Sequence, residues 1–160
     1  MTFYRPHSLV ARITPPATLS RFLGPEENFA PTVWGQLVDF ESWIKWMPGV
    51  DTIERQDEGS PGRGSTFLIK DIVGEHTCEI SYWDPARRLD LVMSLRNKRL
   101  GYSFTLHNAT DDRDTELRLG MEFEFHGLSS LLSVPLAAIE KRRAAVLLER
   151  FVTHMQYYCA

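Results

Sequence analysis

The sequence has few cysteines and no long apolar run. Its two cysteines, Cys78 and Cys159, have neither the spacing of a metal site nor that of a disulfide framework, so we expect a reducing compartment. Nowhere do about 18 apolar residues follow one another, and the first residues lack the apolar segment of a signal peptide. These absences predict a cytoplasmic protein without a membrane span.

An excess of basic charge and the common ligand-binding motifs are missing as well. The chain has 18 lysine and arginine residues and 21 acidic ones, and its formal net charge of -3 gives no electrostatic reason to bind nucleic acid. The five histidines show no metal-ligand spacing, and the glycine-containing segment 59–64 lacks the P-loop pattern. We therefore expect no nucleic-acid partner, no metal and no cofactor.

What is present is a chain of 160 residues with ordinary hydrophobic (43%) and charged (24%) fractions. A chain of this length buries roughly two-thirds of its unfolded surface around one core. No internal repeat or low-complexity tract divides it. The composition predicts a single domain over residues 1–160.

The apolar positions change their period along the chain. Alternation predicts a short strand over residues 8–13, and spacings of three and four then predict two short helices, which begin near Pro31 and end at Pro48-Gly49. Beyond this break the period falls to two in six segments, 51–58, 65–71, 76–83, 89–95, 100–108 and 115–125. Short turns separate these segments, which predicts an antiparallel meander.

One face of the predicted sheet is almost wholly apolar. In the last strand Leu119, Met121 and Phe123 alternate with Glu122 and Glu124, which therefore belong to the outer face. The same alternation in the other strands assigns to the inner face Phe67, Ile69, His76, Cys78, Ile80, Tyr82, Leu91, Met93, Tyr102 and Phe104. A face with so few acids and bases favours ligand binding over catalysis.

A 3.6-residue period from Ser133 to about Tyr157 predicts one long amphipathic helix that crosses the sheet. Leu147 and Phe151 lie on its apolar side, and Glu140 projects within the same arc. Two interpretations of Glu140 stay open at this point. It either faces a cavity, or it lies at the open end of the sheet and pairs with an arginine.

Two further groups of side chains also have two interpretations. Arg143, Arg150 and His154 follow one edge of the apolar helix side, where they either extend into water or meet the polar end of an apolar ligand. Trp43 and Trp46 stand three residues apart. Both suit a core plug, and Trp46 is also a candidate for the border of a ligand cavity.

The order of these elements and several short motifs resemble one family. Ala30-Pro31 opens the first helix, Trp43-x-x-Trp46-Met47-Pro48-Gly49-Val50 closes the second, and Asp84-Pro85-x-Arg87-Arg88-Leu89 joins two strands. In this order they are similar to the polyketide cyclase/dehydrase-like family of the START and birch-pollen-allergen (SRPBCC) superfamily. The resemblance implies an α+β helix-grip fold. In this fold a seven-stranded curved antiparallel sheet wraps around a long C-terminal helix, with two short helices after the first strand.

The resemblance covers nearly all of the chain beyond residue 30. The sequence departs from the family pattern before residue 30. Roughly 15 residues separate the first strand from Ala30-Pro31, where the family has a few. Either Leu19 to Leu23 belongs to the first strand, or residues 15–30 are an insertion near the cavity or a subunit contact. A subunit contact would make the protein a homodimer.

The resemblance also implies a cavity for hydrophobic ligands between sheet and helix, which leaves three functions as alternatives. The first is binding or transport of a lipid, a quinone or a polyketide-like molecule. The second is a polyketide cyclase, aromatase or dehydratase reaction, with Tyr102, Glu140, Arg150 and His154 as candidate catalytic residues. The third is a protein-interaction module whose cavity is filled by its own side chains. The predicted ligand-binding residues are Trp46, Phe67, Ile69, Cys78, Ile80, Leu91, Met93, Tyr102, Phe104, Leu119, Met121, Phe123, Leu147, Arg150, Phe151 and His154.

Overall fold

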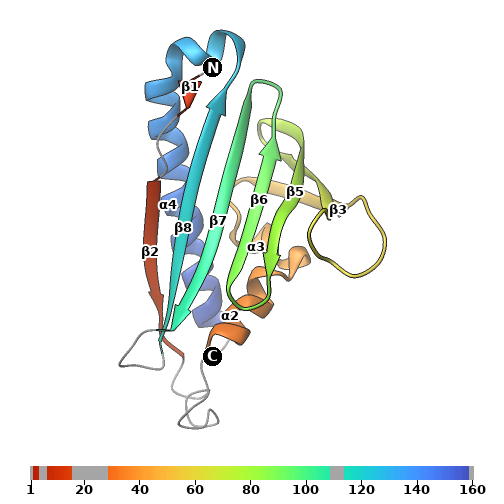
Figure 1. Ribbon diagram of the computed structural model, residues 1–160, viewed down its shortest axis with the longest axis vertical. Coiled ribbons are helices and arrows are strands. Elements are labelled where there is room, and N and C mark those ends of the chain that lie inside the picture. Colours follow the sequence, from red (N-terminus) through yellow and green to blue (C-terminus); the bar gives the residue numbers. More distant parts are fainter. Residues whose placement is uncertain (1, 4–6, 16–28, 109–113, 159–160) are drawn as a thin grey trace.

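The computed structural model describes residues 2–3, 7–15, 29–108 and 114–158 (Figure 1). The elements, in chain order, are β1 (Thr2–Phe3), β2 (His7–Ile13), α2 (Ala30–Leu37), η1 (Phe40–Ser42), α3 (Trp43–Trp46), β3 (Val50–Arg55), β4 (Thr66–Asp71), β5 (Gly74–Asp84), β6 (Arg88–Ser94), β7 (Lys98–Asn108), β8 (Thr115–Phe125), η2 (Gly127–Leu132) and α4 (Ser133–Tyr158). The elements η1 and η2 are 3-10 helices.

One antiparallel sheet contains all of these strands, and β8, β7, β6, β5, β4 and β3 are neighbours in that order. Both β1 and β2 pair with the edge of β8 that β7 leaves free, β1 opposite residues 124–125 and β2 opposite residues 115–121. The seven predicted strands are therefore confirmed. The two-residue β1 extends one edge of the sheet and was not predicted.

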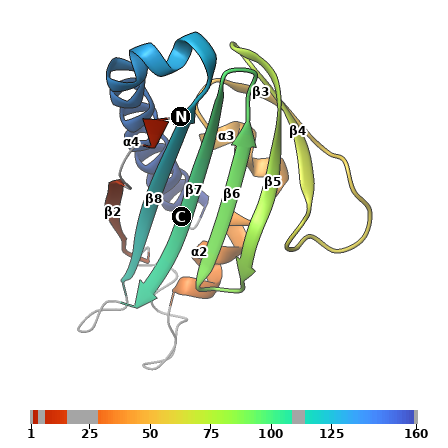
Figure 2. The ribbon, with the colours of Figure 1, turned by 45° about the horizontal axis from the view of Figure 1, so that its top comes forward.

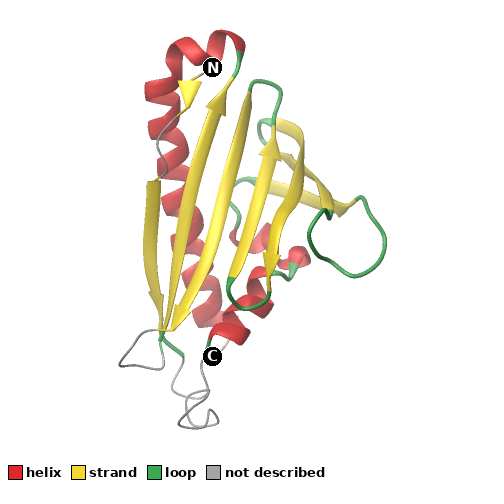
Figure 3. Cartoon of the chain, viewed as in Figure 1, coloured by secondary structure: helices red, strands yellow, loops and turns green. Residues whose placement is uncertain are grey.

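The sheet curves, and the helices lie on one of its faces (Figures 2 and 3). Helix α4 spans 26 residues and packs along β2 and β8. The predicted start at Ser133 and the predicted end near Tyr157 agree with its observed ends to within one residue. The apolar side of α4 is buried against the sheet, and this burial stabilises the helix. The helix-grip architecture is confirmed.

The two short helices close the lower end of the sheet in Figure 1. Helix α2 carries Pro31 in its first turn, where the missing N–H would have had no partner. The second predicted helix consists of η1 followed by α3. It ends before Gly49, whose φ of 73° is a left-handed conformation that glycine adopts without steric cost.

The core follows the alternation of the strands. In β8, Leu119, Met121 and Phe123 are buried between the sheet and the helices, as predicted. The assignment of Tyr82 to the inner face was wrong. The pairing of β5 with β6 shifts register between Ile80 and Tyr82, and this bulge turns the Tyr82 side chain outward, where it is 43% exposed.

Trp43 and Trp46 are both fully buried. The Trp43 indole donates a hydrogen bond from Nε1 to the Leu37 carbonyl oxygen over 2.9 Å. The Trp46 ring packs edge-on against Phe151 with 4.9 Å between ring centroids, and its Nε1 has no hydrogen-bond partner among the described residues. The pair joins the short helices to α4 and is part of the core.

Two further predictions concern the segment 15–30 and membrane spans. Most of the predicted insertion at residues 15–30 lies outside the described residues, which omit 16–28, so it stays a prediction. Among the helices of the described ranges, none is long and apolar enough to cross a membrane.

Candidate functional site

A pocket of about 180 Å³ lies between the sheet and the first half of α4. Its walls are the connection from α3 to β3, the turn between β4 and β5, the inner faces of β4 to β7, and one side of α4. Much of the lining is apolar, with Met47, Ile69, Met93, Leu100 and Leu147 among its residues. The pocket therefore occupies one end of the sheet–helix interface rather than its middle.

A buried ion pair forms part of the lining. Lys98 at the start of β7 donates a hydrogen bond from Nζ to Oε1 of Glu140 on α4. The two side chains are 12% and 4% exposed. Arg143 also contacts Glu140, with 3.3 Å between Nη1 and Oε1, although its side chain is 44% exposed. The buried carboxylate is thus shared by two cations, which offsets the cost of its desolvation.

Tyr102 brings a hydroxyl group to the same pocket from β7. The residue is buried, and no other described residue forms a hydrogen bond with its hydroxyl. Burial, and then the negative charge of Glu140, raise the pKa of Tyr102 above its ordinary value. The phenol therefore stays protonated at physiological pH and remains available as a hydrogen-bond donor.

His76 and Asp71 lie at the side of the pocket formed by the β4–β5 turn. His76 Nδ1 is 3.8 Å from Asp71 Oδ2, and the imidazole side chain is 5% exposed. Burial lowers the pKa of His76, while the charge of Asp71 opposes that shift. The buried imidazole is therefore mostly neutral near pH 7 and can accept or donate a proton.

The pocket brings together some of the predicted site residues. Tyr102 and Glu140 line it together, and both interpretations of Glu140 are partly correct, because it faces the pocket and also pairs with Arg143. Of the predicted apolar ligand contacts, Ile69, Met93 and Leu147 also line it.

The other predicted apolar contacts are buried in the core outside the pocket lining. They are Trp46, Phe67, Cys78, Ile80, Leu91, Phe104, Leu119, Met121, Phe123 and Phe151. Burial raises the pKa of the Cys78 thiol to about 12, so this cysteine is an unreactive core residue. These side chains belong to the hydrophobic core, and their predicted contact with a ligand stays a prediction.

Arg150 and His154 do not join Tyr102 and Glu140. They border a separate surface groove, together with Lys45. His154 Nε2 lies 3.0 Å from Oε1 of the buried Gln36, so the imidazole already has a protein partner. Partial burial and the charge of Lys45 lower the pKa of His154. The four candidate catalytic residues therefore do not line one pocket, and their joint catalytic role stays a prediction.

Sequence reasoning missed Lys98 and made no use of His76. Lys98 was assigned to a turn, yet it shares its strand parity with Leu100 and Tyr102, so continuing the two-residue period would have placed it on the inner face. His76 was placed on the inner face, but it was treated as one of five scattered histidines. In both cases the alternation of the strand was the available signal.

Comparison with known proteins identifies the family. Residues 30–156 match the family described as polyketide cyclase / dehydrase and lipid transport. This match covers most of the chain, and the protein belongs to that family. No curated protein matches the sequence.

Several solved structures share the fold. An aromatase/cyclase, Zhui, from a Streptomyces species is 15% identical with a TM-score of 0.73, and the match covers 97% of this chain and 94% of that one. A START superfamily protein from Mycobacterium smegmatis is 16% identical with a TM-score of 0.66, covering 94% and 98%. A conserved protein from Geobacillus kaustophilus is 13% identical with a TM-score of 0.69, covering 95% and 94%. At these identities the likeness establishes the fold alone.

Proposed function

We propose that the protein binds an apolar small molecule that carries a hydrogen-bond acceptor, in the pocket between β4–β7 and α4. The observation that carries the proposal is the Tyr102 hydroxyl, to which no other described residue forms a hydrogen bond, on a residue that is 6% exposed and lines a largely apolar pocket. A ligand oxygen that accepts a hydrogen bond from this phenol would gain roughly 0.5–1.5 kcal/mol of binding free energy. The family description, which includes lipid transport, is consistent with this function.

The size of the pocket restricts the ligand. Pockets for drug-sized molecules enclose about 300–1,000 Å³, while an apolar cavity of about 150 Å³ is enough to hold benzene. The 180 Å³ found here suits one ring or two fused rings. A quinone ring or a polyketide-derived ring fits this volume, whereas a lipid chain would have to extend out of the pocket.

Calorimetric titration with two probes that share one fused-ring carbon skeleton tests the proposal. The probes are 2-methyl-1,4-naphthoquinone, which carries two acceptor oxygens, and 2-methylnaphthalene, which carries none. We expect the quinone to bind about three- to tenfold more tightly, the gain of one hydrogen bond. Tyr102→Phe should remove that preference, while Tyr82→Phe, on the exposed side of the sheet, should keep it.

A filling substitution tests the location. Leu147→Trp inserts a larger side chain into the pocket lining and should abolish binding of both probes, whereas Leu132→Trp at an exposed position should leave binding unchanged. Mass spectrometry of gently purified protein would additionally identify a bound native ligand. Absence of binding for both probes, or equal affinities that Tyr102→Phe leaves unaltered, would refute the proposal.

A second candidate function is an acid–base reaction of the polyketide cyclase or dehydratase type. It is favoured by a specific observation: a protonated phenol, a neutral imidazole and a carboxylate line one pocket, from Tyr102, His76 and Glu140. In this reaction His76 would remove a proton, and Tyr102 with Lys98 would stabilise the oxygen that gains negative charge.

Turnover of a poly-β-ketone thioester separates this candidate from simple binding. His76→Gln should reduce the rate of cyclisation by at least about a hundredfold, because proton transfer by a side chain contributes on the order of 10²–10⁴. Its affinity for the naphthoquinone probe should stay close to that of the unaltered protein. A protein that binds the thioester but does not convert it is a carrier, and the enzymatic candidate is then wrong.

A further inference from the structure

The segment between β8 and α4 exposes a group of large apolar side chains. Leu128 and Leu131 in η2 are 84% and 80% exposed, and Leu132 and Val134 are exposed as well. Leucine side chains are seldom exposed in such a group on the surface of a soluble protein. We call these four residues the η2 patch.

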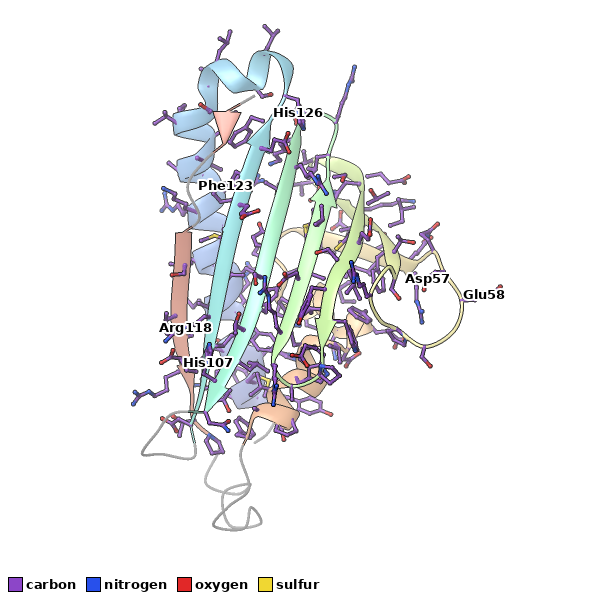
Figure 4. The ribbon with its side chains drawn as sticks, in the orientation of Figure 1. Asp57, Glu58, His107, Arg118, Phe123 and His126 are labelled. Atoms are coloured by element: carbon purple, nitrogen blue, oxygen red, sulfur yellow. The ribbon has the colours of Figure 1, made fainter. Side chains whose placement is uncertain are left out.

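The η2 patch lies at the same end of the sheet as the pocket. The His126 amide donates to the Asn97 carbonyl oxygen over 2.8 Å, and Asn97 Nδ2 donates to Ser129 Oγ over 2.9 Å. These bonds fix η2 beside the β6–β7 hairpin, whose Lys98 lines the pocket. Figure 4 labels His126 at this end of the sheet, with His107 near the opposite end.

Basic side chains surround the patch. Residues 95–99 and 124–143 together contain six lysine and arginine residues and two acidic residues, although the whole chain has a net charge of -3. Arg96 and Arg99 on the hairpin and Arg142 on α4 are exposed. Of the two acidic residues, Glu124 lies opposite Arg99 in the β7–β8 pair, with its Oε1 3.9 Å from His126 Nδ1. Glu140 is buried and paired with Lys98 and Arg143. This end of the molecule is therefore positive as well as apolar.

We propose that the η2 patch and its basic rim dock on the surface of an anionic lipid bilayer. Exposed leucines can enter the boundary between head groups and acyl chains, and arginines beside them attract anionic lipid head groups. A second copy of this chain fits less well, because a two-fold contact through the patch would bring two positive rims together. The inference uses no property of the pocket ligand and does not depend on the proposed function.

Vesicle flotation tests the docking surface with the full chain. Vesicles of phosphatidylcholine alone are compared with vesicles in which about 30% of the lipid is phosphatidylglycerol, because the attraction requires anionic head groups. We expect flotation with the anionic vesicles, weaker flotation with the neutral ones, and release at high salt.

Matched variants separate the two parts of the surface. The double variant Leu128→Ser/Leu131→Ser should reduce bound protein by at least about tenfold, while Tyr157→Ser, which removes an equally exposed ring near the other end of α4, should not. Arg96→Glu/Arg99→Glu should abolish the preference for anionic vesicles. Arg63→Glu in the β3–β4 loop should keep it. Circular dichroism confirms that each variant is folded.

Three outcomes overturn the proposal. The first is failure of the unaltered protein to float with anionic vesicles. The second is flotation that the Leu128→Ser/Leu131→Ser variant retains. The third is a dimer in sedimentation velocity that this variant loses while vesicle binding is absent, which would assign the patch to a second copy of the chain.

Discussion

The buried ion pair between Lys98 and Glu140 gives the sharpest test of the structure. Both side chains are almost inaccessible, at 12% and 4% exposed, so removing one partner leaves a charge that water cannot solvate. Breaking a buried pair in this way costs about 3–5 kcal/mol. For Lys98→Met we expect the lower end, about 3 kcal/mol, because Arg143 still contacts the carboxylate.

Replacing both partners should restore most of the lost stability. In Lys98→Met/Glu140→Leu no charge is left unpaired, apart from the half-exposed Arg143, and apolar replacements of buried pairs are often neutral. We therefore expect the double variant within about 1 kcal/mol of the unaltered protein and a coupling free energy of at least about 2 kcal/mol. Urea unfolding followed by tryptophan fluorescence measures all four free energies of unfolding.

The matched control is the surface pair Lys70–Glu75. Its side chains are 49% and 53% exposed with 3.3 Å between Nζ and Oε2, so the same cycle there should give a coupling of less than about 1 kcal/mol. The free-energy changes of the Lys98 and Glu140 substitutions could instead add without coupling, or each could be no larger than that of a substitution in the surface pair. Either result would contradict the conclusion that Lys98 and Glu140 form a buried ion pair.

Two further predictions concern other buried groups. Trp43→Phe should destabilise the protein by about 1 kcal/mol more than Trp46→Phe, because only Trp43 loses a hydrogen bond, that to Leu37; equal losses in urea unfolding would contradict this. Burial lowers the pKa of His76 below the ordinary value of 6.5. As the pH falls, His76 is therefore protonated first in the unfolded chain. The stability that the neutral imidazole provides above pH 6.5 is then lost progressively until the pH passes the pKa of the folded state. His76→Asn should therefore reduce the loss of stability between about pH 7.5 and pH 5, whereas His107→Asn on the exposed end of β7 should not; identical pH profiles for all three proteins would count against it.

The strands were predictable because each buries one face. In β8 the apolar side chains of Leu119, Met121 and Phe123 repeat every two residues, so parity alone assigns the inner face. The same rule failed at Tyr82, because the bulge in β5 depends on pairing with β6 and leaves no mark in the period. The two-residue alternation of apolar side chains thus predicted the inner face of each strand wherever one pairing register continued along the whole strand.

The candidate site was only partly predictable. The helical period shows which side of a helix a residue occupies, but it does not show which residues elsewhere in the fold lie at the same level along the helix axis. Arg150 was grouped with Glu140 from the side of α4 that both occupy. Ten residues separate them, however, which is about 15 Å along a helix axis. Arg150 therefore borders another groove. The partner of Glu140 is Lys98, 42 residues away in sequence, and no local pattern contains that contact.

Two walls of the pocket, the β6–β7 hairpin and the β4–β5 turn, differ in the contacts that keep them in place. On one side the Lys98–Glu140 pair fastens the β6–β7 hairpin to α4, so any widening there has to separate opposite charges. On the other side the β4–β5 turn ends in exposed Ile72 and Val73, and the hydrogen bonds that Asp71 accepts are internal to that turn. We therefore expect the pocket to open more easily at the turn. A molecule that exchanged with solvent would then pass Ile72 and Val73, while the Lys98–Glu140 pair keeps the far wall closed.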